Sequence, residues 1–179
     1  MKLPDKKELA LFKRSSVRRF SDRQMHEAEV QFVLEAAMAA PSANNRRPWR
    51  FIVITQSERL DYFAERLQYG KALKTAKAAI VVCGVPEYQG MQDDHWIQGC
   101  SAAIQNMLLA LTEVGLGGVW LGIYPRENRM QMIKKACEIP ADMIPFAVVA
   151  MGQPVNDLFR NREYEVDKVH WNQWDSKQI

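Results

Sequence analysis

The stretch from Trp96 to Val114 limits the possible folds more than any other part of the chain. Its residues fit one long helix, and apolar side chains occupy much of the circumference: Ile97, Ala102, Ala103, Ile104, Met107, Leu108, Leu109 and Leu111. A helix that is apolar nearly all round must be covered on most of its sides. We therefore expect it at the centre of a domain or between two subunits.

Other segments supply strands and amphipathic helices around it. The spacing of apolar residues predicts helices over Glu27–Ala40, over a segment with Ser57 as its N-cap, and over Arg126–Cys137. Runs rich in β-branched and aromatic residues predict strands at Trp49–Thr55, Ala78–Val85, Gly115–Tyr124 and Phe146–Met151. Alternating strands and helices favour a parallel βαβ sheet, although strands of this length also suit a mixed sheet.

No linker or repeat divides the chain, so we expect one domain over residues 1–179. Its last segment, 152–179, is polar with three aromatic residues and no helical period, and we expect this tail to lie over another surface.

Composition excludes several classes of protein. Apolar residues make up 47%, which is typical of a folded globular chain. No apolar run reaches the roughly 18 residues that a bilayer span needs, and no signal peptide is recognisable. Cys83, Cys100 and Cys137 are odd in number and lack metal-ligand spacing. We expect a cytoplasmic protein with no metal site and no membrane partner.

Arginines gather in two places. In the first, Arg14, Arg18 and Arg19 flank two serines; guanidinium forks and serine hydroxyls suit a phosphate, and a solvated basic helix end explains the same residues equally well. Arg46, Arg47 and Arg50 form the second group. Together they could bind a nucleic acid or another anion, but interleaved acids and a net charge of only +3 count against a nucleic acid.

Two further segments have unusual residue types for their positions. The loop from Pro41 to Trp49 carries Ser and Asn side chains that could bind a ligand or close their own turns. Glycines interrupt the predicted strand at Gly115–Tyr124, and such glycines often mark close approach of a ligand to the backbone. A flat aromatic cofactor explains them, and so does a tight turn at Gly117-Gly118.

Taken in order, these segments resemble the nitroreductase family of FMN-dependent oxidoreductases. The family's Arg-Arg-Ser-x-Arg-x-Phe type motif is similar to residues 14–20 (RSSVRRF), and its Ala-Pro-Ser-x-x-Asn-x-x-Pro-Trp loop is similar to residues 40–49 (APSANNRRPW). The long helix at 100–109, the glycine strand at 115–122 and the closing segment at 169–174 also match. The resemblance covers nearly the whole chain, and its specificity comes from five motifs in register.

The resemblance implies an α+β fold, a three-layer sandwich whose mixed, largely antiparallel sheet lies between helices. It also implies a homodimer with two flavins at the interface and a C-terminal tail that extends onto the partner. Such a dimer accounts for the nearly all-apolar helix and for a tail that has no support of its own.

The resemblance also assigns residues to FMN. Arg14, Ser15 and Ser16 would hold its phosphate and ribityl end, and Arg18 would approach the pyrimidine edge. Contacts to the isoalloxazine ring would come from Pro41, Ser42, Ala43 and Asn45 of the partner subunit. Trp120, Leu121, Gly122 and Ile123 would lie at the reactive N5, and Arg160 and Arg162 would complete the phosphate site.

The implied activity transfers electrons from NADH or NADPH through flavin N5 to a nitroaromatic, a quinone or a similar small molecule, in a ping-pong order. It needs no catalytic Ser, Cys or His, and Arg18 would stabilise the reduced flavin. Alternatives are a flavin carrier or sensor, or a related enzyme that dehalogenates, oxidises or fragments its substrate. Three residues depart from the family pattern: Arg47 replaces a frequent glutamine, Gly99 an acidic residue, and Gly122 the glutamate of some members.

Overall fold

The computed structural model describes residues 3–156 and 163–174. Strands β1 (Trp49–Ile54), β2 (Ala78–Gly84), β5 (Gly117–Gly122) and β6 (Ile144–Gly152) form one sheet in the order β1-β2-β6-β5, and each neighbouring pair is antiparallel. Parallel pairing occurs, within the described ranges, in an isolated bridge between Ser16 and Gly118. The α+β fold with a largely antiparallel sheet is confirmed, and the parallel βαβ alternative is wrong.

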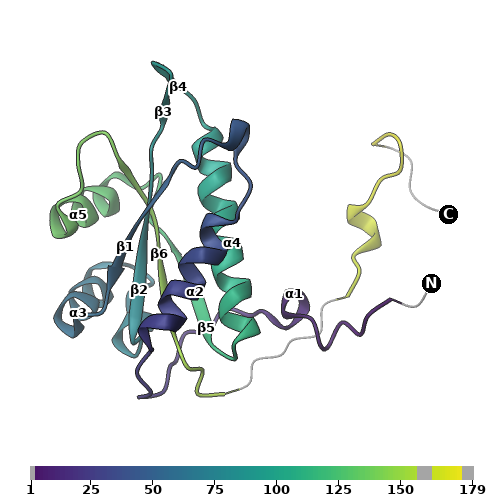
Figure 1. The fold of residues 1–179 in the computed structure, drawn as a ribbon, viewed down its shortest axis with the longest axis horizontal. Coiled ribbons are helices and arrows are strands. Elements are labelled where there is room, and N and C mark those ends of the chain that lie inside the picture. The colour runs from purple at the N-terminus through teal and green to yellow at the C-terminus, as the bar shows by residue number, and fades with distance from the viewer. Residues whose placement is uncertain (1–2, 157–162, 175–179) are drawn as a thin grey trace.

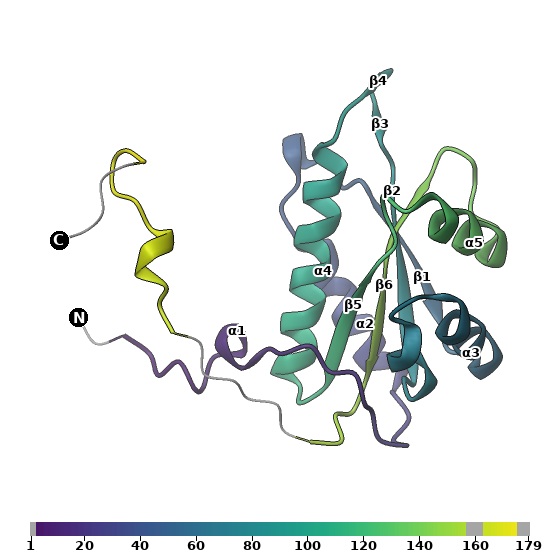
Figure 2. The ribbon, with the colours of Figure 1, turned by 180° about the vertical axis from the view of Figure 1, so that it is seen from behind.

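Helices cover both faces of this sheet (Figures 1 and 2). Helices α2 (Glu27–Met38) and α4 (His95–Glu113) lie on one face, and α3 (Ser57–Arg66) and α5 (Glu127–Cys137) lie on the other. All residues of β2 are buried, and they alternate between the two cores: Ile80 and Val82 pack under α2 and α4, whereas Val81 and Cys83 pack under α3 and α5. The three-layer sandwich is therefore confirmed.

Short elements complete the chain. They are α1 (Ala10–Lys13), η1 (Ala43–Asn45), η2 (Gly70–Lys74), β3 (Glu87–Tyr88), β4 (Met91–Gln92) and η3 (Val166–Lys168). Each predicted helix and strand is present with its ends moved by a few residues. The N-cap prediction for Ser57 is wrong, because Gln56 holds the cap position and Ser57 is the first helical residue.

Helix α4 has the buried position that its composition predicts. Nine of its 19 residues are buried: Trp96, Gly99, Cys100, Ala103, Ile104, Met107, Leu108, Ala110 and Leu111. At 1.5 Å per residue the helix is about 27 Å long. Its first turn lies near the end of β5, since the rings of Trp96 and Tyr124 are 5.1 Å apart. Its last turn leads into the start of β5. The two ends of β5 therefore lie near opposite ends of α4.

The described part of the C-terminal tail stands apart from the sheet and its helices (Figures 1 and 2). Its aromatic side chains are exposed, Tyr164 at 65% and Trp174 at 78%. The described segments nearest the two chain ends, 3–13 and 163–174, lie on the α4 side of the sheet (Figure 1). Among the described helices, none combines the length and the apolar character that a membrane span requires.

Candidate functional site at the edge strand

The first arginine segment, residues 14–20, is fastened to the start of edge strand β5. The Val17 N–H donates to the Gly118 carbonyl oxygen at 3.0 Å, and the Val17 side chain is buried against Gly117. A Cβ atom on Gly117 would lie 2.3 Å from Val17 Cγ2, so only glycine lets the two backbones approach this closely. Both glycines lie inside β5, and the interpretation of Gly117-Gly118 as a tight turn is therefore wrong.

This attachment places the predicted phosphate-binding residues beside the strand. Arg14, Ser15 and Ser16 are half-buried, whereas Arg18 is exposed. The Arg18 guanidinium lies over its own segment, since its Nη1 donates to the Ser16 carbonyl oxygen at 3.3 Å. Arg14, Ser16 and Arg18 therefore form a cationic and hydroxyl-bearing group at the start of β5.

The other end of β5 exposes bare backbone at Gly122. The Ile123 N–H donates to the Phe146 carbonyl oxygen of β6 at 3.1 Å, so Ile123 directs its peptide groups into the sheet. Because this direction alternates along an edge strand, Gly122 directs its N–H and C=O outward, as does Gly118, whose carbonyl accepts from Val17. Gly122 is exposed, and a Cβ added to it would meet nothing within 4 Å. The strand thus ends in an outward peptide with open space above it.

An arginine from α5 holds this peptide. Arg129 Nη1 donates to the Gly122 carbonyl oxygen at 3.0 Å, and its Nη2 donates to Gln68 Oε1 at 2.6 Å. Nothing in the sequence pattern pointed to Arg129. The two bonds link α5, the end of α3 and the edge strand at one point.

The neighbours of Gly122 turn their side chains inward. Leu121 and Ile123 are buried in the core under α3 and α5. Trp120 is half-buried, and its ring packs 5.8 Å from that of Phe146. Of these four predicted residues, Gly122 is the exposed one, and it has no side chain to cover its outward peptide.

The loop with the predicted ring contacts, residues 41–48, closes its own turns. Ser42 Oγ accepts from the Arg47 N–H at 3.0 Å, and Asn45 Oδ1 accepts from Arg47 Nε at 3.0 Å. Asn44, Asn45 and Arg47 have φ angles of 50°, 53° and 50°, a left-handed conformation that Asn adopts more readily than Arg. Pro41 and Asn45 are exposed, and Ser42 and Ala43 are half-buried. The Ser42 hydroxyl and the Asn45 amide nitrogen can each still donate a hydrogen bond to a ligand.

Packing on α4 fixes where this loop lies. A Cβ on Gly99 would lie 2.9 Å from Pro48 Cγ and 3.5 Å from Ser42 Cβ, so the departure at Gly99 has a packing reason. Arg46 forms an ion pair with Asp93, just before α4, and Asp93 also accepts from the His95 N–H. The Arg46 guanidinium holds the pKa of Asp93 below its ordinary value.

One chain does not bring all the predicted residues together. The segment carrying Arg14 to Arg18 and the exposed Gly122 share the β5 edge, whereas the loop carrying Ser42 to Asn45 leads into β1 at the opposite edge. Three strand spacings separate these edges, about 14 Å. The arginine segment also lies at the far end of α4 from the loop. In a single chain the two groups therefore lie at opposite edges of the sheet and at opposite ends of α4.

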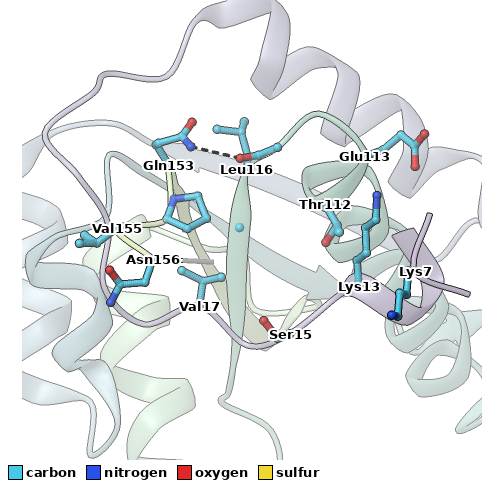
Figure 3. Close-up of a pocket in the computed structure, with 13 residues that line it drawn as sticks. Lys7, Lys13, Ser15, Val17, Thr112, Glu113, Leu116, Gln153, Val155 and Asn156 are labelled. Carbon is cyan, nitrogen blue, oxygen red and sulfur yellow. Dashed lines mark hydrogen bonds between the residues drawn. The ribbon is translucent and has the colours of Figure 1, made fainter. Parts of the chain in front are cut away.

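A cavity of about 760 Å³ lies behind the arginine segment (Figure 3). It is lined by Lys13, Ser15 and Val17, by the end of α4, and by the residues that follow β6. Successive residues of extended backbone point to opposite sides, and Arg14, Ser16 and Arg18 are absent from this lining. The cavity therefore opens on the side of the segment away from most of its predicted cofactor contacts.

The remaining sequence predictions bear less on the geometry. Arg160 and Arg162 lie outside the described residues. The described part of the chain contains no group of three or more His, Cys, Asp or Glu side chains that could hold a metal ion. Of the arginines in the alternative anion-binding surface, Arg46 has an acid partner in Asp93.

Comparison with known proteins decides the family. The family model described as the nitroreductase family matches residues 11–86 and 64–153, which include the arginine segment, the loop and Gly122. The chain belongs to the nitroreductase family.

Relatives across this family share most of its length. A nitroreductase-family protein from Archaeoglobus fulgidus, provisionally named NADH dehydrogenase/NAD(P)H nitroreductase, is 41% identical over 92% of this chain and 96% of its own length. A structure with the same provisional name from Bacteroides thetaiotaomicron is 35% identical, with a TM-score of 0.88 over 97% of this chain and 100% of its own. The structure of a provisionally named nitroreductase from Desulfovibrio desulfuricans, in complex with FMN, is 30% identical, with a TM-score of 0.81 over 97% and 99%.

Proposed function

We propose that this chain is an FMN-dependent oxidoreductase that works as a homodimer. It takes electrons from NADH or NADPH and passes them to a nitroaromatic, a quinone or a similar acceptor. The observation that carries the proposal is the bare, outward peptide of Gly122 with open space above it. The Desulfovibrio relative, whose structure holds FMN, extends this support to the identity of the cofactor.

The β5 edge has the length and chemistry that FMN needs. Ser16 pairs with Gly118, four residues before Gly122, which corresponds to about 13 Å along the strand. Arg14 and Ser16 would hold the phosphate and ribityl end, and the Gly122 N–H would donate to the ring. Bound FMN supplies the redox chemistry, and this chain supplies binding, orientation and charge.

Arg18 has an electrostatic part in this proposal. Its exposed guanidinium stands on the segment that lines the same edge, where it would stabilise negative charge on the pyrimidine end of the ring. Cys83 and Cys100 are poorly suited to nucleophilic chemistry, because burial raises the pKa of their thiols to about 12. All three cysteines are free, as a reducing cytoplasm would keep them.

A second copy of the chain would complete each site. Ser42, Ala43 and Asn45 lie at the opposite sheet edge from their own arginine segment, and a two-fold axis would bring the same residues from the partner. A groove of about 350 Å³ between α2 and α4 is lined mostly by apolar residues and suits such an interface: Ala10, Phe32, Ala36, Ala39, Asn106, Leu109, Ala110 and Glu113. Phe32 is 41% exposed, and the exposed tail aromatics would lie over the partner.

The test combines cofactor analysis with kinetics. We expect a yellow protein that releases FMN, not FAD, when heated. NAD(P)H oxidation with a quinone or nitroaromatic acceptor should give the parallel double-reciprocal lines of a ping-pong order, since donor and acceptor would occupy the same face in turn. A colourless protein that takes up no added FMN would refute the proposal, and bound FMN without turnover would indicate a carrier.

Arg18 and its neighbour Arg19 provide a matched pair of variants. Both side chains are exposed, and only Arg18 is expected at the ring. We expect Arg18→Ala to bind FMN and turn over slowly, and Arg19→Ala to keep the wild-type rate. Equal rates for the two variants would refute the role of Arg18.

A further inference from the structure

We propose that Arg47 and Arg50 form a subsite for the carboxylate or phosphate group of a substrate. The subsite lies beside the loop that the proposed dimer places against the flavin ring, and its role in turnover rests on that proposed function. Anion binding by these two arginines does not depend on that function.

The two arginines line a cavity of about 170 Å³. Its walls come from the loop at residues 42–48, from Arg50 of β1, from residues 85–87 after β2, and from residues 93–96 at the start of α4. Liquid water occupies about 30 Å³ per molecule, so this volume holds one carboxylate or phosphate group with a few waters. The cavity is too small for a cofactor.

Arg46 has an acidic partner at this cavity, whereas Arg47 and Arg50 form no ion pair within the described ranges. Arg46 forms its ion pair with Asp93. Arg47 Nε donates to the neutral Asn45 side chain, and Arg50 Nη1 donates to the Trp49 carbonyl oxygen at 2.7 Å. Among the described residues neither guanidinium takes part in an ion pair.

Two acids, Glu87 and Asp93, and the His95 imidazole also line the cavity. Asp93 is engaged by Arg46 and by the His95 N–H and imidazole. Glu87 also lines the cavity, and within the described ranges it forms no ion pair with either arginine. The wall therefore carries the positive charges of Arg47 and Arg50 and the negative charge of Glu87, in addition to the Arg46–Asp93 ion pair. Its net charge is positive.

The loop backbone positions the Arg50 side chain, and both arginines line the same cavity. Arg50 Nη1 lies 3.4 Å from the Arg47 carbonyl oxygen, so the Arg50 side chain runs back under the loop. Arg47 has a φ of 50°, a left-handed conformation that non-glycine residues seldom adopt, and Ser42 Oγ accepts its N–H there. Such strain is typical of binding sites. Two guanidinium-bearing residues that line one cavity offer planar donor forks, which suit a carboxylate or phosphate.

The position of the subsite connects it to turnover. Arg47 follows Asn45 by two residues, and Asn45 is one of the residues expected against the partner's flavin ring. A substrate that stacks on the ring could therefore place an anionic substituent in the cavity. Two sources fit this chemistry: a carboxylate on the acceptor, or the 2′-phosphate of NADPH.

Paired substrates separate these sources. We would measure kcat/KM for 4-nitrobenzoate against 4-nitrobenzamide, and for NADPH against NADH, in the wild type, in Arg47→Gln, in Arg50→Gln and in the double variant. Arg19→Gln is the control, because it removes an exposed guanidinium outside the cavity. A charged hydrogen bond is worth about 1.5–3 kcal/mol, so we expect the double variant to lower one of the two ratios by about tenfold to a hundredfold.

Glu87→Gln gives a test in the opposite direction. Removing this carboxylate should raise the same ratio, whereas a variant that merely disturbs folding would lower activity with every substrate. A fall in the nitrobenzoate ratio identifies an acceptor anion, and a fall in the NADPH ratio identifies the donor phosphate. If the double variant changes neither ratio, the subsite is refuted, while turnover of 4-nitrobenzamide by the wild type still supports the proposed function.

A binding measurement tests the subsite even if the proposed function is wrong. Calorimetric titration of the purified protein with 4-nitrobenzoate and with NADP⁺, which carries the 2′-phosphate but no transferable hydride, needs no turnover. Binding of either probe that is lost in the double variant and kept in Arg19→Gln supports the subsite. The absence of binding of both probes to the wild type would overturn it.

Discussion

Replacing Gly122 by alanine should separate cofactor binding from folding. The added methyl group would meet nothing within 4 Å inside the chain, and the backbone at this position is not in the left-handed region. Alanine at such a compatible site stabilises a protein by about 0.4–1 kcal/mol, chiefly by restricting the unfolded chain. The apoprotein should therefore unfold at the same or a slightly higher urea concentration.

The same methyl group would stand between the Gly122 peptide and the ring of bound FMN. The ring would lose a hydrogen bond worth about 0.5–1.5 kcal/mol, together with part of its van der Waals contact with the strand. We expect a loss of about 1.4 kcal/mol or more, which corresponds to at least about tenfold weaker binding. Gly122→Val should weaken FMN binding further.

Two titrations test this prediction. Urea unfolding of the apoprotein measures the free energy of unfolding, and quenching of FMN fluorescence measures the dissociation constant. Wild-type FMN affinity in Gly122→Ala would show that the ring does not lie on this peptide. A loss of more than about 1 kcal/mol in apoprotein stability would instead show that the space above Gly122 is occupied.

Three further predictions concern the scaffold. Gly117→Ala should destabilise the protein by about 1–3 kcal/mol through overpacking against Val17, and Val17→Ala should recover part of that loss; strictly additive urea-unfolding energies would contradict the contact. Arg46 lowers the pKa of Asp93, so this pair contributes its full stabilisation above the ordinary value of 3.8 and loses it as the pH falls through the lowered folded-state pKa. The stability difference between the wild type and Asp93→Asn should therefore shrink in acid, and a difference that is constant with pH would disprove the pairing. Cys100 should resist iodoacetamide in the native protein at pH 8, because burial raises its pKa to about 12; labelling at the rate of a free thiol would contradict this.

Local patterns predicted the elements because they depend on residues close in sequence. The apolar circumference of residues 96–114 predicted a buried helix, and α4 is buried. Strand directions did not follow from composition, since the pairing of β2 with β6 joins residues about seventy positions apart. The resemblance to a family, not the strand sequences, gave the antiparallel sheet.

The glycines show what a sequence can and cannot predict about a site. The glycines of this strand predicted that another group lies close to the backbone, and such a group is present at Gly117. It is the Val17 side chain, 100 positions earlier in the sequence, and not a ligand. At Gly122 the space is open, as a cofactor would need. Arg129, which holds the Gly122 carbonyl, carried no recognisable signal because its contact depends on how α5 packs.

Subunit complementation tests the central claim that each cofactor site is shared between two chains. One variant would carry Arg14→Ala and Arg18→Ala, and the other Ser42→Ala and Asn45→Ala, each with its own affinity tag. We expect both homodimers to bind FMN poorly. Heterodimers isolated through both tags should regain tight binding at one of their two sites, because one site then combines intact arginines with an intact partner loop. Tagged heterodimers that bind FMN no better than either parent would contradict the shared site.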